Sequence, residues 1–203
     1  MTTFDRIRYA IALLLLLTGP GAVLFWFPIH PFARFWRRVG ATWAYAAGGA
    51  VYAASAAVLA TYRQTLMSID FGTSAVAIAL GCVFLAAHLW LRRLWRRQLK
   101  MRTLYGVPEV APDRAPSVLL TEGVYARIRH PRYVEIILGY TGFACVSNYL
   151  AAYGTTAFLA LGILVLIPIE ERELAERFGE AYEEYRRRVP ALIPRLGKSR
   201  DAG

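Results

Sequence analysis

Five long apolar stretches are separated by polar segments along the chain. They run from about Tyr9 to Phe27, Thr42 to Tyr62, Gly72 to Leu91, Tyr133 to Val146, and Leu150 to Ile169. A helix that crosses a bilayer needs roughly 20 consecutive, mostly apolar residues. The first three stretches reach about this length, and the last two are somewhat short. The pattern predicts an all-α, polytopic membrane protein with about five transmembrane helices.

The first apolar stretch has two interpretations. Arg6 and Arg8 precede it, as basic residues precede the apolar part of a secretory signal peptide, and a cleavage site would then lie near TGPGA. The apolar run continues through VLFWF beyond that point. We therefore favour a retained helix over a cleaved signal.

A polar, proline-containing segment divides this single membrane domain into two halves, 1–110 and 111–203. The segment reads YGVPEVAPDRAPS, and its three prolines favour a loop. The first half holds three apolar stretches and a basic segment. The second half holds the other two stretches, which a short connection joins into a helical hairpin, together with the residues that carry candidate chemistry.

The chain changes from apolar to charged beyond Pro168, where it reads EERELAERFGEAYEEYRRR. Leu174, Phe178, Tyr182 and Tyr185 recur at helical spacing within this segment. We therefore expect one charged, amphipathic C-terminal helix, which ends at the prolines of VPALIP.

Composition supports a membrane protein and argues against a nucleic-acid partner. The chain is 57% hydrophobic, yet its formal net charge is +10. Its isoelectric point near 10.0 would also suit a nucleic-acid-binding protein. The basic residues, however, border apolar runs and do not form a polar face of their own. We expect the lipid bilayer as the partner, and the sequence leaves the oligomeric state open.

Basic residues gather on one side of the predicted membrane domain. With five spans, the loop after the first span, the segment after the third and the C-terminal tail share a side, and all three are rich in arginine. The opposite side receives Arg6, Arg8 and Arg63. Because cytoplasmic loops carry an excess of arginine and lysine, we expect the C-terminus and the cofactor site in the cytoplasm and the N-terminus outside.

The segment GVYARIRHPRY enters the fourth apolar stretch through a run of basic residues. Pro131 lacks an amide hydrogen and restrains His130 to extended geometry, which favours a helix start at this point. Free amide hydrogens at a helix start suit an anion, and Arg129, His130 and Arg132 strengthen that field. Contact with lipid phosphates is the alternative for the arginines, and a capping role is the alternative for His130.

Two acidic residues, Glu170 and Glu171, directly follow the fifth apolar stretch. Carboxylates at a membrane boundary are costly and usually have a partner, which here is either Arg129 or a bound cation. Glu171 shares a helical face with Leu174 and should point inward, whereas Glu170 should be solvated. A charged helix start that the helix dipole favours is the alternative for the pair.

A ligand with both cationic and anionic groups would satisfy the basic and the acidic residues together. S-adenosylmethionine is such a molecule, with a sulfonium, an ammonium and a carboxylate. NADPH would also suit the arginines, but the chain has no glycine-rich phosphate motif after a strand. The two cysteines, Cys82 and Cys145, are not spaced as metal ligands, and we expect no metal site.

The ordered motifs GVYARIRHPRY, EERELAERFGEAYEEY and VPALIP, within 117–194, resemble those of the isoprenylcysteine carboxyl methyltransferase family. The wider group includes membrane enzymes that N-methylate phospholipids. The resemblance implies that S-adenosylmethionine binds in a cytoplasm-facing pocket between the last two spans and the C-terminal helix. The residues that it implies for the cofactor are Ser117, Val118, Leu119, Leu120, Tyr125, His130, Pro131, Arg132, Tyr133 and Glu171.

The chain departs from this family at two positions that bear on the substrate. Eukaryotic members have a histidine in place of Ser117, and a substrate-binding arginine before the acidic pair, where this chain reads LVLIPIE. The acceptor is therefore predicted only as lipophilic: an isoprenylcysteine-like carboxylate, a lipid, or a small thiol or amine. Arg129 would hold an anionic acceptor, and Glu170 or Glu171 would serve as the base for an amine.

Two other functions fit parts of the sequence. Sterol reductases, which use NADPH, share a similar arginine–histidine–proline–tyrosine loop and a tyrosine-rich tail. A non-catalytic, lipid-binding membrane protein would also account for the apolar spans and the basic side.

Overall fold

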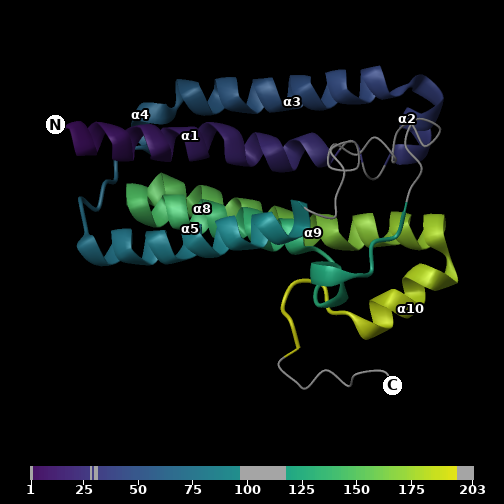
Figure 1. Ribbon diagram of the computed structural model, residues 1–203. Helices are drawn as coiled ribbons and strands as arrows, with labels where there is room; N and C mark the ends of the chain where they lie inside the picture. Colours follow the sequence, from purple (N-terminus) through teal and green to yellow (C-terminus); the bar gives the residue numbers. More distant parts are fainter. Residues whose placement is uncertain (1, 28, 30–31, 97–117, 196–203) are drawn as a thin grey trace.

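The described residues form a bundle of long helices with shorter pieces at its ends (Figure 1). The computed structural model describes residues 2–27, 29, 32–96 and 118–195. The long helices are α1 (Thr3–Trp26), α3 (Ala41–Thr61), α5 (Ala75–Arg96), α8 (Pro131–Ser147) and α9 (Leu150–Phe178). The short ones are α2 (Ala33–Val39), α4 (Arg63–Leu66), the 3-10 helix η2 (Gly123–Ala126) and α10 (Glu180–Arg188). The all-α prediction is confirmed, and each predicted apolar span corresponds to one long helix.

The chain is an integral membrane protein. Helices α1, α3, α5 and α9 are long and apolar enough to cross a bilayer. Helix α8, with 17 residues, is at the lower limit for a span and lies within the same bundle. Successive long helices run in opposite directions, so that the N-terminus and α10 lie at opposite ends (Figure 1). Which end faces the cytoplasm stays a prediction, and the expected boundary near residue 110 lies outside the described residues.

Helix α1 packs against α3 on one side and against α8 and α9 on the other, while α5 packs against α8. Glycine permits the close approach of α5 and α8. A Cβ atom on Gly81 would lie 2.8 Å from the carbonyl oxygen of Gly142, and one on Gly142 would lie 3.0 Å from the carbonyl oxygen of Gly81. Small residues at such crossings are typical of helix packing in membranes. The contact sets the register between α5 and α8.

Local signals explain the starts of two helices. Thr2 and Asp5 form a reciprocal capping box at the start of α1, with the amide of Thr2 donating to Asp5 at 2.8 Å and the amide of Asp5 donating to Thr2 at 3.1 Å. Pro131 is the first residue of α8, where its missing amide hydrogen costs nothing. The predicted helix start at Pro131 is confirmed.

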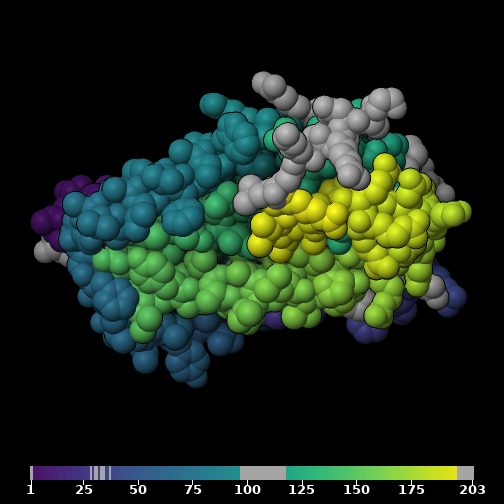
Figure 2. Space-filling view, turned by 90° about the horizontal axis from the view of Figure 1, so that it is seen from below, coloured from purple at the N-terminus to yellow at the C-terminus, as the bar shows by residue number. Residues whose placement is uncertain are grey.

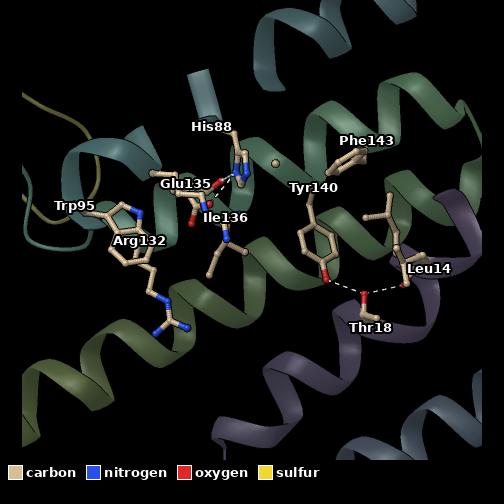
Figure 3. Close-up of a pocket in the computed structure, with 12 residues that line it drawn as sticks. Leu14, Thr18, His88, Trp95, Arg132, Glu135, Ile136, Tyr140 and Phe143 are labelled. Carbon is tan, nitrogen blue, oxygen red and sulfur yellow. Dashed lines mark hydrogen bonds and ion pairs between the residues drawn. The ribbon is translucent and has the colours of Figure 1, made fainter. Parts of the chain in front are cut away.

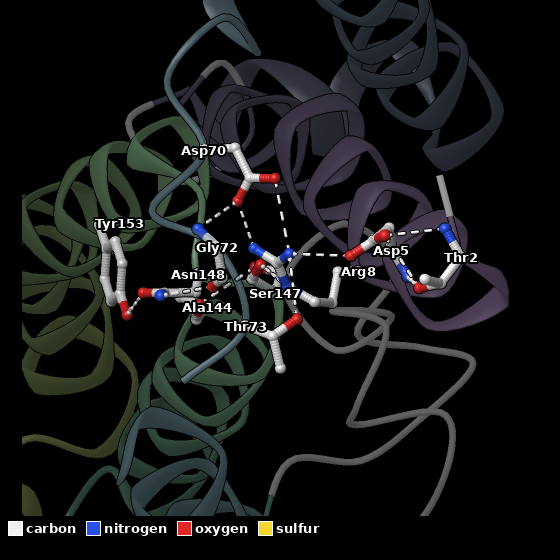
Figure 4. A network of polar contacts seen from close by, with 10 residues as sticks. All are labelled: Thr2, Asp5, Arg8, Asp70, Gly72, Thr73, Ala144, Ser147, Asn148 and Tyr153. Atoms are coloured by element: carbon white, nitrogen blue, oxygen red, sulfur yellow. Dashed lines mark hydrogen bonds and ion pairs between the residues drawn. The ribbon is translucent and has the colours of Figure 1, made fainter. Parts of the chain in front are cut away.

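A buried arginine closes the end of the bundle that carries the N-terminus (Figure 4). Only 1% of the surface of Arg8 is exposed. Its Nε donates to the carbonyl of Ser147 at 3.0 Å, and its Nη2 is paired with Asp70. Asn148 donates to the carbonyl of Gly72 at 2.9 Å beside them. Arg8 therefore joins α1, the segment before α5 and the α8–α9 turn, and does not serve as an exposed boundary charge.

The predicted C-terminal amphipathic helix is present as α10, but the prediction that it begins directly beyond Pro168 is wrong. Helix α9 continues through Pro168 to Phe178, and the break comes at Gly179. A proline inside a spanning helix removes one backbone hydrogen bond, which packed membrane helices tolerate. Gly179 has φ +58° and ψ −134°, a conformation that residues with a side chain rarely adopt. The change of direction places α10 beside the loop before α8 (Figure 2).

Candidate functional site

The basic loop before α8 and the acidic residues of α9 meet, as the sequence predicted. Glu171 Oε1 accepts hydrogen bonds from Arg129 Nε at 2.9 Å and Nη2 at 2.6 Å, and lies 3.0 Å from His130 Nε2. The Glu171 side chain is 10% exposed. Its predicted inward orientation and its predicted partner, Arg129, are both confirmed.

Glu170 is bonded and only partly solvated, in contrast to the expectation from the sequence. The hydroxyl of Tyr133 donates to Glu170 Oε2 at 2.7 Å, and His130 Nδ1 lies 3.8 Å from the same oxygen. The rings of His130 and Tyr133 stack, with centroids 5.5 Å apart and an interplanar angle of 22°. Because His130 and Tyr133 flank the turn into α8, they bring the helix start against both carboxylates of α9.

The loop also pairs with the segment that follows α10. The amides of Arg129 and His130 donate to the carbonyls of Pro190 at 2.9 Å and Ala191 at 3.0 Å. The Nη1 of Arg129 donates to the carbonyls of Arg186 and Val189. The guanidinium thus bonds to Glu171 on one side and to main-chain oxygens on the other, and it holds three segments together.

Buried tyrosines from α10 form the floor of this cluster. The hydroxyl of Tyr185 donates to the carbonyl of Tyr125 at 2.7 Å, and burial raises the pKa of Tyr185 to about 12. Tyr182 is 1% exposed, and its hydroxyl finds no hydrogen-bond partner within the described part of the chain. Burial raises the pKa of Tyr182 above its ordinary value, with the nearby charge of Glu171 adding to the effect. An unsatisfied buried hydroxyl beside charged groups marks a place where a polar ligand can bind.

Some of the other residues that the resemblance implied lie beside this cluster, and others lie apart from it. Leu119 packs against the buried tyrosines of α10, and Leu120 packs in a cluster with Tyr125. Val118 is exposed, and Ser117 lies outside the described residues. Arg132 lines a cavity on another side of α8. The structure therefore brings together five of the predicted residues in one bonded cluster: Arg129, His130, Tyr133, Glu170 and Glu171.

The cluster carries a residual negative charge. Arg129 contributes one positive charge, and Glu170 and Glu171 contribute one negative charge each, which leaves −1 before any proton on His130 is counted. Arg129 offsets Glu171 directly. Glu170 has a tyrosine hydroxyl as its donor, and its charge remains for a cationic ligand.

Sequence reasoning missed a second polar pair, His88 and Glu135, which lies inside the bundle. His88 Nδ1 is 3.0 Å from Glu135 Oε1 and 3.0 Å from the Glu135 carbonyl oxygen. The pair borders a cavity of about 400 Å³ between α1, α5 and α8 (Figure 3). The sequence did contain a signal for this pair, namely one histidine and one glutamate in two different predicted spans. Ionisable residues inside spans are rare and usually functional.

Comparison with known proteins gives one family and several partial relatives. The sequence model of the phospholipid methyltransferase family matches residues 76–181, just over half of the chain. The chain is 40% identical to methanethiol S-methyltransferase of Crocosphaera subtropica over 42% of this chain and 33% of that protein. It is 41% identical to the cobalt-zinc-cadmium resistance protein CzcN of Cupriavidus metallidurans over 41% of this chain and 38% of that protein.

A third relative is protein-S-isoprenylcysteine O-methyltransferase of Schizosaccharomyces pombe, 35% identical over 38% of this chain and 33% of that protein. The matched segment thus spans about a third of the length of these relatives. No solved structure matches the chain.

Proposed function

The chain belongs to the phospholipid methyltransferase family, and we propose that it transfers a methyl group from S-adenosylmethionine to a small or lipid-borne acceptor in the membrane. Two of the relatives bear the names of methyltransferases that act on methanethiol and on isoprenylcysteine. The observation that carries the proposal is the unsatisfied hydroxyl of Tyr182 beside the bonded cluster of Arg129, Glu170 and Glu171.

The residues of the cluster fit this cofactor in charge. S-adenosylmethionine has two cationic groups and one carboxylate, hence a net charge of +1, which matches the residual −1 of the cluster. Glu170 would face the cationic part, and Tyr182 would donate to an oxygen of the ligand. His130 and Tyr133 would close over it, and the backbone of Ser117, Val118, Leu119 and Leu120 would line the adenosyl part. When bound, the sulfonium supplies an activated methyl group.

The chain's own part in the reaction is to position the reactants and exclude water. Arg129 has donors engaged with Glu171 and with two carbonyls, so we assign it a positioning role, in place of contact with an anionic acceptor. Methyl transfer to an anion neutralises charge, and such a step gains from alignment and from a dry site. We also propose that the arginine-rich end of the bundle faces the cytoplasm.

Titration calorimetry of the detergent-solubilised full chain tests the proposal. We expect S-adenosylhomocysteine to bind, and Glu170→Gln or Tyr182→Phe to weaken binding by about 10-fold, which corresponds to roughly 1.4 kcal/mol. Glu183→Gln is the matched control, because Glu183 pairs on the surface with Arg186 at 2.8 Å. Binding of NADPH without S-adenosylhomocysteine would overturn the proposal in favour of a reductase-like enzyme. Binding of neither would favour a non-catalytic protein.

A further inference from the structure

The cavity beside His88 and Glu135 combines apolar walls with a few polar groups, as binding sites for small molecules do. Leu14 and Phe143 are among its apolar residues, while His88, Glu135 and Arg132 line it from α5 and α8, with His88 and Glu135 in direct contact (Figure 3). The first turn of α8 borders both this cavity and the cluster at Glu171, since Arg132 lines the cavity and the adjacent Tyr133 donates to Glu170 of the cluster. The cavity is therefore placed to hold a second reactant next to the first.

The contacts of His88 decide which ring nitrogen carries its hydrogen. The backbone carbonyl of Glu135 can only accept a hydrogen bond, and it lies 3.0 Å from Nδ1. Nδ1 therefore carries the hydrogen, which it shares with the carboxylate at 3.0 Å. In the neutral ring the lone pair is then on Nε2. A histidine whose Nδ1–H is held by a carboxylate is the arrangement with which enzymes take a proton through Nε2.

A glycine allows the histidine to reach this position. A Cβ atom on Gly139 would lie 2.7 Å from His88 Nδ1 and 3.0 Å from Cε1. Gly139 is one helical turn beyond Glu135 on α8, so the ring lies directly against the helix backbone. The absence of a side chain at residue 139 is what brings Nδ1 within bonding distance of Glu135.

The surroundings favour an anion in the cavity. Arg92 and Arg132 border it, and both, with Arg96, act on the carboxyl of Glu135 through their charges. Helix α1 contributes only uncharged residues to the lining. The Nε1 of Trp95, which is 5% exposed, has no hydrogen-bond partner among the described residues and lies in the cavity wall. Two arginines against the one carboxylate of Glu135 leave a net positive charge at the cavity, and this charge stabilises an anionic group bound there.

We propose that this cavity binds a thiol acceptor and that His88 removes its proton, with Glu135 as the residue that positions His88. An amine would become cationic on methylation, next to two arginines, and a carboxylate needs no base. Of weak acids, a cysteine-like thiol with a pKa of about 8.5 is closer to histidine, at about 6.5, than a phenol at about 10. The inference rests on the proposed function and names the acceptor and the base for that reaction.

The proposed step balances in atoms and charge. The S–H bond of the thiol breaks, and its proton goes to His88 Nε2. The thiolate sulfur forms a bond to the methyl carbon as the bond between that carbon and the sulfonium breaks. The products are a neutral thioether and neutral S-adenosylhomocysteine, and the imidazolium later releases its proton to water.

The test compares two thiols of different acidity with His88→Asn. The asparagine amide keeps a donor near the Nδ1 position and removes the basic nitrogen. We expect kcat for hexanethiol to fall by about 100-fold or more, in the range for loss of a general base. The fall in kcat for thiophenol should be at least tenfold smaller than that for hexanethiol, because thiophenol ionises without help from a base. Phe143→Leu, which changes only an apolar wall, should alter KM and leave the two thiols equally affected.

Glu135→Gln tests the positioning role. The glutamine keeps an acceptor oxygen but loses the charge, so we expect kcat for hexanethiol to fall while its KM stays within about twofold. A merely structural role of Glu135 would raise KM or abolish folding, and would affect both thiols alike.

Two further measurements separate failure of this inference from failure of the proposed function. Binding of S-adenosylhomocysteine should be unchanged in His88→Asn. Without cofactor, the native protein should show the absorbance of the thiophenol thiolate at a pH where free thiophenol is protonated, and His88→Asn should not. Equal losses for both thiols, or methylation of amines and not of thiols, would overturn the inference and leave the methyltransferase proposal standing. Absence of S-adenosylhomocysteine binding in the native chain would overturn both.

Discussion

Arg129 and Glu171, 42 positions apart in the sequence, are joined by hydrogen bonds of 2.6 and 2.9 Å to one carboxylate oxygen. The bond ties the loop before α8 to the last turns of α9, and the same guanidinium holds the segment after α10. One ion pair therefore organises the loop, the acidic residues and the C-terminal segment into a single cluster.

Replacement of Glu171 by glutamine should destabilise the cluster and abolish cofactor binding. The variant leaves the Arg129 charge without its partner in a site that is 10% exposed, a loss that typically costs about 3 kcal/mol or more. Thermal unfolding in detergent and calorimetry with S-adenosylhomocysteine measure the two effects. Glu184→Gln is the control, since its pair with Arg188 at 3.6 Å is largely exposed. Native stability and affinity in Glu171→Gln would contradict the role given to this pair.

Acid should weaken the contact between Asp70 and Arg8 at the opposite end. Burial alone would raise the pKa of Asp70, but hydrogen bonds from the Gly72 amide and from Arg8 outweigh it and hold the pKa below its usual value. An unfolded aspartate titrates at about pH 3.9. The stabilisation is therefore complete above that pH and is lost as the pH falls through the lower native pKa.

The measurement is unfolding of the native chain and of Asp70→Asn at pH 7 and pH 3. Because Asp70 is about a third exposed, we expect a difference of about 1 kcal/mol at pH 7, and a smaller difference at pH 3, where the unfolded state binds more protons. A difference that does not change with pH would show that the Asp70 charge is not what stabilises this end.

Gly139→Ala should displace His88 without disturbing cofactor binding. The added Cβ would lie 2.7 Å from His88 Nδ1, closer than such atoms approach, so the ring must leave Glu135. We expect methyl transfer to hexanethiol to fall by about 10-fold or more, while the affinity for S-adenosylhomocysteine stays native. Gly154→Ala is the matched control, because a Cβ atom on Gly154 would meet open space. Alanine in that helix should keep activity and add up to about 1 kcal/mol of stability.

Gly179→Ala should loosen α10 from the rest of the bundle. Its φ of +58° and ψ of −134° are strained for any residue with a side chain, at a cost of about 1–3 kcal/mol. The strain can be relieved if α10 turns away, which would separate Tyr185 from Tyr125 and expose Tyr182. Faster proteolysis within residues 180–195 and weaker binding of S-adenosylhomocysteine would report this. Gly49→Ala, in an open position of α3, should show neither.

Much of the architecture could be read from local properties of the sequence. Apolar length marks each spanning helix, and Pro131 marks the start of α8, because these features act within one turn or one span. The meeting of Arg129 with Glu171 was also predictable in kind, since charges at a membrane boundary require partners. Local reasoning failed at two positions. The packed bundle tolerates Pro168 inside α9, and Gly179 takes a conformation that no local sequence pattern predicts.

Tertiary structure alone decided which faces of the helices meet. His88 and Glu135 are 47 positions apart and look like isolated polar residues in apolar spans until Gly81, Gly142 and Gly139 let α5 lie against α8. The burial of Arg8 and the unsatisfied hydroxyl of Tyr182 likewise depend on neighbours that are distant in sequence. Hydrophobicity determines that a helix enters the membrane. It does not determine which face of the helix packs against its neighbours, because all the faces of such a helix are apolar. The choice of face is left to close packing between helices, which places the polar pairs and hence the candidate chemistry.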